Sequence, residues 1–134
     1  MPMVRVACLP GLIAALVAGT ALADGRAEVA RGDAVNGRVI FEQLCSICHA
    51  ASADGSGETR GPNLFAVVGR RAGSEQNFAM YSPALQAYGA KWNISALDEF
   101  LKDPVATVPG TNMPVSMPDD MERADVIAYL ASLK

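Results

Sequence analysis

Apolar side chains recur at three- and four-residue intervals along residues 33–48, the spacing that places them on one face of an α-helix. The residues on this face are Ile40, Phe41, Leu44, Cys45 and Cys48. Asp33 stands ahead of the run and is a candidate N-cap. The pattern predicts a first helix whose apolar stripe continues into the two cysteines.

A last helix is predicted over residues 119–133, where apolar side chains again share one face. The members of this face are Val126, Tyr129, Leu130 and Leu133. Gly37, in the first predicted helix, has no side chain to hold a neighbouring backbone away. We therefore expect the backbone of the last helix to approach the first helix closely at this glycine.

Two shorter helices are predicted between these long ones. A Ser-Pro pair at 82–83 is a helix start, and Gly89 is suited to end that helix. Ser95 and Asp98 have the spacing of a capping box for a second helix, which Pro104 stops. Because the chain has no strand-rich alternating segments, the pattern favours an all-α fold.

Length, composition and charge narrow the classes of function. The chain has 134 residues, enough for one domain. Its 51% hydrophobic and 19% charged content excludes a disordered tail. The net charge of −3 and pI of about 5.0 argue against a nucleic-acid-binding protein.

Residues 1–23 have the pattern of a secretory signal peptide: an early positive charge, an uncharged apolar stretch and a small-residue triplet. An uncleaved membrane anchor is the alternative, although Pro10 interrupts a run that is already marginal for a span. Cleavage after residue 23 would remove Cys8 and leave a single domain at 24–134. The pattern predicts an exported, periplasmic protein.

Cys45-Ser46-Ile47-Cys48-His49 has the C-x-x-C-H spacing of a covalent haem attachment motif. The two thiols are spaced to bond two vinyl groups of one haem, and His49 follows at once as a proximal iron ligand. A thiol-redox pair is an alternative, but no βαβ pattern accompanies it. A zinc site is another, but it would need a fourth ligand from a carboxylate.

The sequence also restricts the sixth ligand of such an iron. Because His49 is the only histidine, two histidines cannot bind the iron, and methionine sulfur is the remaining soft ligand. Met113 lies between prolines in a stiff loop that presents its side chain to one place. Met117 is the alternative, whereas Met121 lies inside the last predicted helix, where a packing role is expected.

These features in this order resemble the class I c-type cytochromes, the family of small mitochondrial and bacterial cytochromes c. The resemblance covers nearly all of the mature chain. The matching positions are Gly37 and Phe41, Cys45, Cys48 and His49, Gly61 to Leu64, Trp92, Pro109 to Met113, and Glu122 to Leu130. It implies a small monohaem fold of about four to five helices and loops wrapped around one covalent haem c, with the terminal helices crossing.

The resemblance also implies roles around the haem. The Pro62 carbonyl would accept the proton of the second nitrogen of His49, and Trp92, Arg70 and Tyr81 would face the haem propionates. The insertion of one residue before Tyr81 weakens its match. Plainer interpretations are a proline that stiffens a loop and a tryptophan that fills a core.

Two features depart from the family pattern. Phe100 stands where many relatives have a tyrosine that bonds the methionine sulfur, so that hydrogen bond is not expected. The predicted mature chain has few lysines (Lys91, Lys102 and Lys134), so a lysine-rich face is not expected to select its partner.

The function indicated is one-electron transfer without catalysis. The chain would be a periplasmic carrier or a dedicated redox subunit, working between a dehydrogenase or quinol-oxidising complex and a terminal oxidase or reductase. It would dock transiently at the haem edge, as a monomer or as a subunit of a heteromeric oxidoreductase, without nucleic acid and, once cleaved, without membrane insertion. The alternative is a haem enzyme or gas-binding sensor whose sixth ligand is labile.

Overall fold

The computed structural model describes residues 32–55 and 60–134. Its helices in chain order are α2 (Ala34–Ile40), the π-helical turn η1 (Phe41–Cys45), α3 (Pro83–Tyr88), α4 (Ile94–Lys102), α5 (Pro104–Thr107) and α6 (Asp120–Ser132). Across these two ranges the only β-type pairing is an isolated bridge between Arg71 and Lys91. The predicted all-α class is confirmed, whereas the predicted signal peptide lies outside the described residues.

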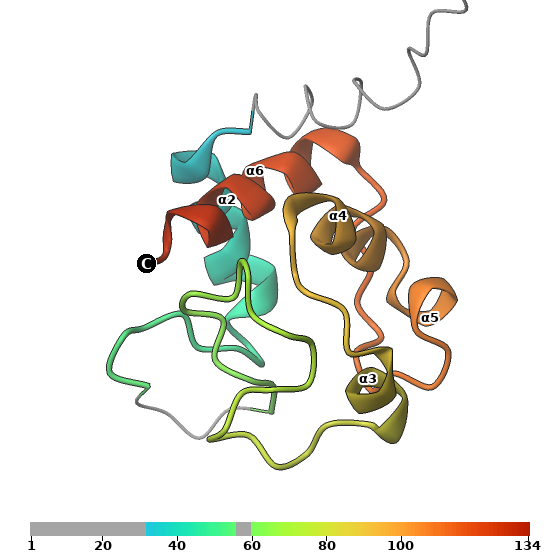
Figure 1. Ribbon diagram of the computed structural model, residues 1–134. Coiled ribbons are helices and arrows are strands. Elements are labelled where there is room, and N and C mark those ends of the chain that lie inside the picture. Colours follow the sequence, from blue (N-terminus) through green and yellow to red (C-terminus); the bar gives the residue numbers. More distant parts are fainter. Residues whose placement is uncertain (1–31, 56–59) are drawn as a thin grey trace, which may run out of the picture.

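Helices α2 and α6 cross in direct backbone contact, as the two terminal helices were expected to do (Figure 1). A Cβ atom at Gly37 would overlap the backbone carbonyl of Asp125, so only glycine allows this approach. The Asp125 carboxylate accepts the backbone N–H of Asp33 at 2.6 Å and the Nδ2–H of Asn36 at 2.6 Å. This buried carboxylate joins α6 to the start of α2.

The helix ends follow the predicted capping residues with one exception. Asp33 caps α2, and Ser82 and Gly89 bound α3. The predicted capping box at Ser95 is wrong, because α4 begins earlier, with the Asn93 side chain accepting the N–H of Ala96 at 2.8 Å. Asparagine is as good an N-cap as serine, and its earlier position adds residues to the helix.

The π-helical turn η1 alters the predicted apolar stripe of the first helix. Its closing hydrogen bond runs from the Ser46 N–H to the Phe41 carbonyl at 2.9 Å, five residues back instead of four. The wider turn carries one extra residue, so the face that holds Phe41 next meets Cys45. Leu44 consequently points outward with 47% of its surface exposed, and its predicted place on the buried face is wrong.

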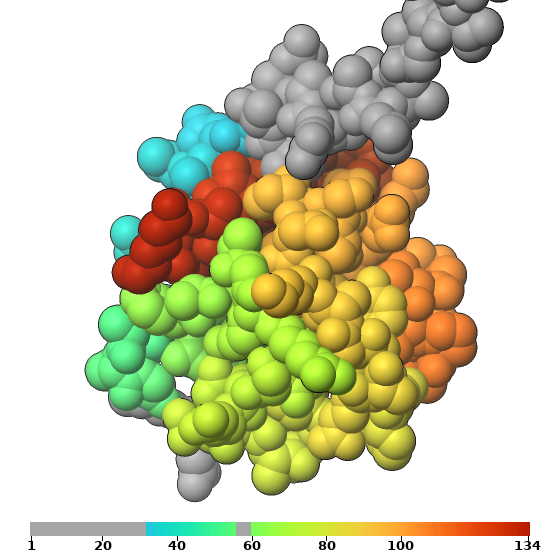
Figure 2. Space-filling view, in the orientation of Figure 1, coloured from blue at the N-terminus to red at the C-terminus, as the bar shows by residue number. Residues whose placement is uncertain are grey.

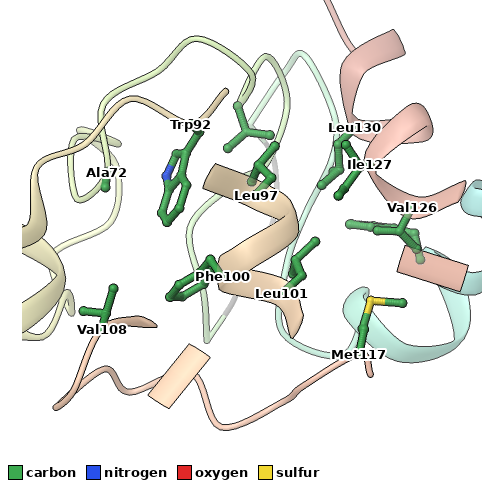
Figure 3. Packing of buried hydrophobic residues seen from close by; sticks show 12 residues of the cluster. Ala72, Trp92, Leu97, Phe100, Leu101, Val108, Met117, Val126, Ile127 and Leu130 are labelled. Carbon is green, nitrogen blue, oxygen red and sulfur yellow. The ribbon is translucent and has the colours of Figure 1, made fainter. Parts of the chain in front are cut away.

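The hydrophobic core lies where α4 and α6 meet, and Figure 3 shows its side chains. Ile127 and Val126 of α6 are fully buried, and Leu97, Phe100 and Leu101 of α4 pack in the same cluster. The segment from 60 to 92 runs largely as loops and covers the lower half of the face seen in Figure 2. The cysteines and His49 lie where α2 and η1 end and these loops begin.

Candidate metal centre

The Cys45–His49 segment forms a tight turn at the end of η1. The N–H groups of Cys48 and His49 both donate to the Cys45 carbonyl, at 3.0 and 2.9 Å. Both cysteines are half-buried free thiols, and Cys45 packs against the hydrophobic core. The turn therefore holds two unpaired thiols and an imidazole within a few residues.

The surroundings of the two thiols do not favour a redox pair or a zinc site. Burial raises the pKa of the Cys45 thiol to about 11, whereas redox-active cysteines have lowered pKa values. Within residues 32–55 and 60–134, no three His, Cys, Asp or Glu side chains gather in a way that could hold a metal ion. A structural zinc site normally needs four such ligands.

His49 is held in an orientation that leaves one ring nitrogen free for a metal. Its Nδ1 lies 2.8 Å from the Pro62 carbonyl, the hydrogen bond expected from the sequence. Burial lowers the pKa of His49, and the Pro62 carbonyl raises it in part, so the net shift favours the neutral ring. Because a carbonyl only accepts, Nδ1 carries the proton and Nε2 keeps its lone pair.

Gly61 allows the His49 ring to lie against the backbone. A Cβ atom at this position would overlap the imidazole, and its nearest neighbours there are all ring atoms. The Gly61 N–H also donates to the Cys48 carbonyl at 2.7 Å. The Gly61-Pro62 pair thus fixes the ring from its face and from its edge.

The two candidate methionine ligands lie in different surroundings. Met117 is 4% exposed, and its N–H donates to the Leu101 carbonyl at 2.7 Å, which places it in the core beside α4 (Figure 3). Met113 is half-buried at the edge of the same core, and its N–H donates to the Thr111 Oγ1 at 3.3 Å. Among the described methionines, Met80 and Met121 are exposed. Of the two candidates, Met113 is the one that is not enclosed in the core.

Trp92 is buried among aromatic rings, but its indole N–H is not enclosed. It is 7% exposed, with ring centroids 5.0 Å from Phe100 and 5.8 Å from Tyr88. Its indole N–H has no hydrogen-bond partner among the described residues, and because no fully enclosed side-chain nitrogen or oxygen of these residues lacks a partner, this N–H keeps access to solvent. An acceptor on a bound group could therefore reach it.

Arg70 and Tyr81 converge on Glu75, which the sequence did not single out. Arg70 donates to the Glu75 carboxylate at 2.7 Å and to the carbonyls of Asn63 at 2.6 Å and Phe65 at 3.3 Å. The Tyr81 hydroxyl accepts the Glu75 N–H at 3.2 Å. Burial raises the pKa of Tyr81, so its hydroxyl keeps a proton to donate. Glu75 could not be found from the spacing of apolar residues in the sequence, because it lies in a loop.

The sequence profile of the cytochrome c family matches residues 34–134. The chain belongs to this family. It is 47% identical over 106 residues to cytochrome c of Tetrahymena pyriformis, a match that covers 78% of this chain and 93% of that protein. It is 41% identical over 115 residues to cytochrome c2 of Rhodomicrobium vannielii, covering 85% and 90%.

The fold of this cytochrome c family member has a counterpart among solved structures. Cytochrome cH from Methylobacterium extorquens superimposes with a TM-score of 0.67 at 36% identity, covering 75% of this chain and 99% of that one. Proteins of this family are electron-transfer proteins and not enzymes. They carry haem c bound through two cysteines, and Cys45 and Cys48 have the required spacing here.

The residues present fit haem c on observations independent of the family. The turn offers two free thiols, the imidazole of His49 has a free Nε2, and the Trp92 N–H keeps access to solvent. These groups match the vinyl carbons, the iron and the propionates of a haem, respectively. The chain's electron-transfer function follows from this cofactor.

Arg123 is a structurally important residue that the sequence analysis missed. It is 3% exposed and donates to the carboxylates of Asp98 and Asp120, both at 2.6 Å, and to the Met117 carbonyl at 2.9 Å. Burial alone would lower the pKa of Arg123, but the two carboxylates raise it overall. This guanidinium joins α4, α6 and the end of the loop that carries Met113.

Proposed function

We propose that the chain is an exported, periplasmic one-electron carrier or a dedicated redox subunit, with His49 and Met113 as the two side chains that would bind its haem iron. The observation that carries the proposal is the hydrogen bond from His49 Nδ1 to the Pro62 carbonyl, which leaves the lone pair of Nε2 free to bind iron. Covalent haem c supplies a one-electron redox centre when bound.

The surrounding residues act by holding the two iron ligands in place, so that other molecules do not replace them. Gly61 and Pro62 keep the His49 ring in one orientation, and the stiff loop around Met113 presents the thioether. With His49 and Met113 both bound to the iron, no coordination position would be left for a substrate. The Trp92 N–H and the Tyr81 hydroxyl would donate to the propionates of the haem, and Arg70, which also pairs with Glu75, would offset part of their charge.

Location and partners are proposed from separate observations. The signal-peptide pattern of residues 1–23 supports export, and bacterial relatives include a cytochrome c2 and a cytochrome cH. None of the described helices has the length and apolar content to cross a bilayer. We infer a transient donor and acceptor, a dehydrogenase or quinol-oxidising complex on one side and a terminal oxidase or reductase on the other.

The first test is an absorption spectrum of the exported holoprotein, oxidised and reduced, with and without carbon monoxide. We expect c-type haem bands, a weak near-infrared band from methionine sulfur on ferric iron, and no response to carbon monoxide. A rapid carbon monoxide shift would instead indicate a haem enzyme or gas sensor with a labile ligand. The absence of haem bands would overturn the proposal.

The methionine assignment is tested with a matched pair of variants. Met113→Ala should abolish the near-infrared band with little loss of stability, because its side chain lies at the edge of the core. Met117→Ala should keep the band but lower the free energy of unfolding by about 2–4 kcal/mol, because it leaves a buried cavity. The opposite result, loss of the band only in Met117→Ala, would falsify the assignment of Met113.

A further inference from the structure

Glu75 is an isolated acidic side chain in a long basic stretch of the chain. Residues 60–97 contain no other Asp or Glu, although the whole chain has 14 of them. The cations of the same stretch are Arg60, Arg70, Arg71 and Lys91. In the fold, Glu75 Oε2 accepts a hydrogen bond from Arg70 Nη1 at 2.7 Å. The carboxylate of this stretch is thus paired with the arginine that is expected to face the haem propionates.

The loop around Glu75 fixes its carboxylate at both oxygens. Oε2 accepts from Arg70, and Oε1 accepts the backbone N–H of Asn77 at 3.3 Å. The backbone N–H of Glu75 donates to the Tyr81 hydroxyl at 3.2 Å, and the Tyr81 ring packs edge-on against Phe78 with centroids 4.9 Å apart. These contacts hold the carboxylate against the guanidinium instead of leaving it free to turn into solvent.

The pair of Arg70 and Glu75 is also shielded from water. Their side chains are 20% and 18% exposed, compared with 66% and 56% for the surface pair of Arg38 and Glu42. Water and salt screen a partly buried charge less than an exposed one. Removing the charge of Glu75 should therefore change the electrostatic potential inside the protein more than removing the charge of Glu42.

The Arg70 guanidinium has N–H groups left for a further anion. Its hydrogen bonds to Glu75 and to the carbonyls of Asn63 and Phe65 occupy fewer donors than a guanidinium has. Under the proposed function, the further anion is a haem propionate. A guanidinium that is shared between two anions offsets less of the charge of each.

We propose that Glu75 is a positioning residue that lowers the reduction potential of the haem, by holding the Arg70 guanidinium and so reducing the positive charge available to the propionates. The inference rests on the proposed function, since it needs a haem whose propionates face Arg70. Ferrous haem has one positive charge fewer than ferric haem, so a nearby negative charge favours the ferric state. Loss of the Glu75 charge removes a negative charge and frees the guanidinium, and both changes raise the potential.

The test is a potentiometric titration of the holoprotein at neutral pH, in wild type and in Glu75→Gln. Glutamine has nearly the same shape and still accepts the Asn77 N–H, so the loop is preserved. At the wild-type midpoint, the ratio of reduced to oxidised protein should be about threefold higher in Glu75→Gln, a shift of roughly 30 mV for a one-electron couple. An unchanged ratio would overturn the proposal.

Glu42→Gln is the matched control, because it removes the same charge from an arginine pair at an exposed site. Glu42 lies three residues before Cys45, closer in sequence to the haem attachment than Glu75. Its loss should nevertheless leave the ratio almost unchanged, because solvent screens the exposed pair. Equal shifts in the two variants would show that net charge alone sets the potential, which would contradict a specific role of Glu75.

The substitution Arg70→Lys tests whether Glu75 acts through Arg70. Lysine keeps the charge but lacks the planar fork that can hold a carboxylate and a further anion together. In the Arg70→Lys background, Glu75→Gln should therefore shift the ratio less than it does in wild type. An equal shift in both backgrounds would mean that Glu75 acts directly on the haem, and its positioning role would be wrong.

Spectra of the same samples separate this inference from the proposed function. Glu75→Gln should keep the circular dichroism and the methionine–iron band of wild type, since loss of the methionine ligand would lower the potential instead of raising it. Loss of that band in Glu75→Gln would show a structural role and overturn the positioning role. Wild type without haem bands or without the methionine–iron band would instead contradict the proposed function and, with it, this inference.

Discussion

The crossing of α2 with α6 and the loop that carries Met113 are held by different means. At the crossing, backbone meets backbone at Gly37, the Asp125 carboxylate receives two hydrogen bonds, and the rings of Phe41 and Tyr129 pack with centroids 5.4 Å apart. In the loop, Asn112 and Val115 beside Met113 are exposed, and the firm contacts lie at the loop ends.

Those end contacts determine where the methionine lies. At one end the Thr111 N–H donates to the carbonyl of buried Val108 at 3.0 Å. At the other end the Met117 N–H donates to the Leu101 carbonyl, and the Met117 carbonyl accepts a hydrogen bond from Arg123. The crossing is therefore stable through its own contacts, whereas the position of the loop that carries Met113 depends on contacts at the two ends of the loop. Substitutions in the two regions should therefore separate global unfolding from loss of the ligand.

The largest effect is expected at the crossing. In Gly37→Ala the new methyl group overlaps the Asp125 carbonyl, so α2 and α6 must move apart and lose buried contact. We expect the free energy of unfolding to fall by about 3 kcal/mol or more, despite the better helix propensity of alanine. Guanidinium titrations should show circular dichroism and the methionine–iron band disappearing together at a lower midpoint.

The control for this variant is Val35→Ala on the exposed side of the same helix, which should unfold close to wild type. A Gly37→Ala protein as stable as wild type would show that the helices tolerate separation. The crossing would then not be a rigid contact, and the contrast with the loop would disappear.

A smaller and different effect is expected at Arg123, the loop anchor, which holds the end of the loop that carries Met113. Arg123→Leu leaves the Asp98 carboxylate and the Met117 carbonyl without their donor. The free energy of unfolding should fall by about 2 kcal/mol, because Asp98 is partly exposed and regains water. The methionine–iron band should now disappear at a lower guanidinium concentration than the helical signal.

Arg123→Lys sharpens this result because it keeps the charge but lacks the planar fork that reaches several acceptors. We expect an intermediate separation of the two midpoints. Identical midpoints for both signals in Arg123→Leu would mean that the loop is held by other contacts and that Arg123 supports only the fold.

The crossing could be predicted from the sequence to a much greater extent than the loop anchors. The features that predicted it are local or periodic: Gly37, the Asp33 cap and the apolar face of α6. Such features can be recognised from a single sequence. Arg123 cannot, because its burial depends on α4 and the loop folding over it. The π-helical turn that exposes Leu44 was missed for a related reason: one extra residue in a turn leaves no mark on the apolar spacing.

In the candidate site the sequence predicted the groups but not what supports them. The bond between His49 and Pro62 was expected from the resemblance to the class I c-type cytochromes. The place of Gly61 against the ring and the meeting of Arg70 with Glu75 were not. Both depend on how loops pack, and loops carry no periodicity from which packing can be inferred.

The smallest expected effect is a dependence on pH at the loop anchor. The hydrogen bond from Arg123, with its charge, holds the pKa of Asp120 below its usual value. A carboxylate with a lowered folded pKa stabilises the fold at pH values above its unfolded pKa, and that contribution is lost as the pH falls through the folded value. The difference in unfolding free energy between wild type and Asp120→Asn should thus be constant above about pH 5 and shrink below about pH 4.

The double variant Asp120→Asn with Arg123→Leu decides whether this dependence belongs to the anchor. Without the guanidinium, Asp120 has lost the main partner that lowers its pKa and keeps only the weaker effect of Lys102, so the effect of adding Asp120→Asn to Arg123→Leu should depend little on pH. A dependence as large as in the wild-type background would place its origin elsewhere, at Lys102 or at the positive start of α6, where Asp120 lies in the first turn. In that case the loop anchor would act through the Asp98 and carbonyl contacts of Arg123 alone, and acid would leave the position of Met113 unchanged.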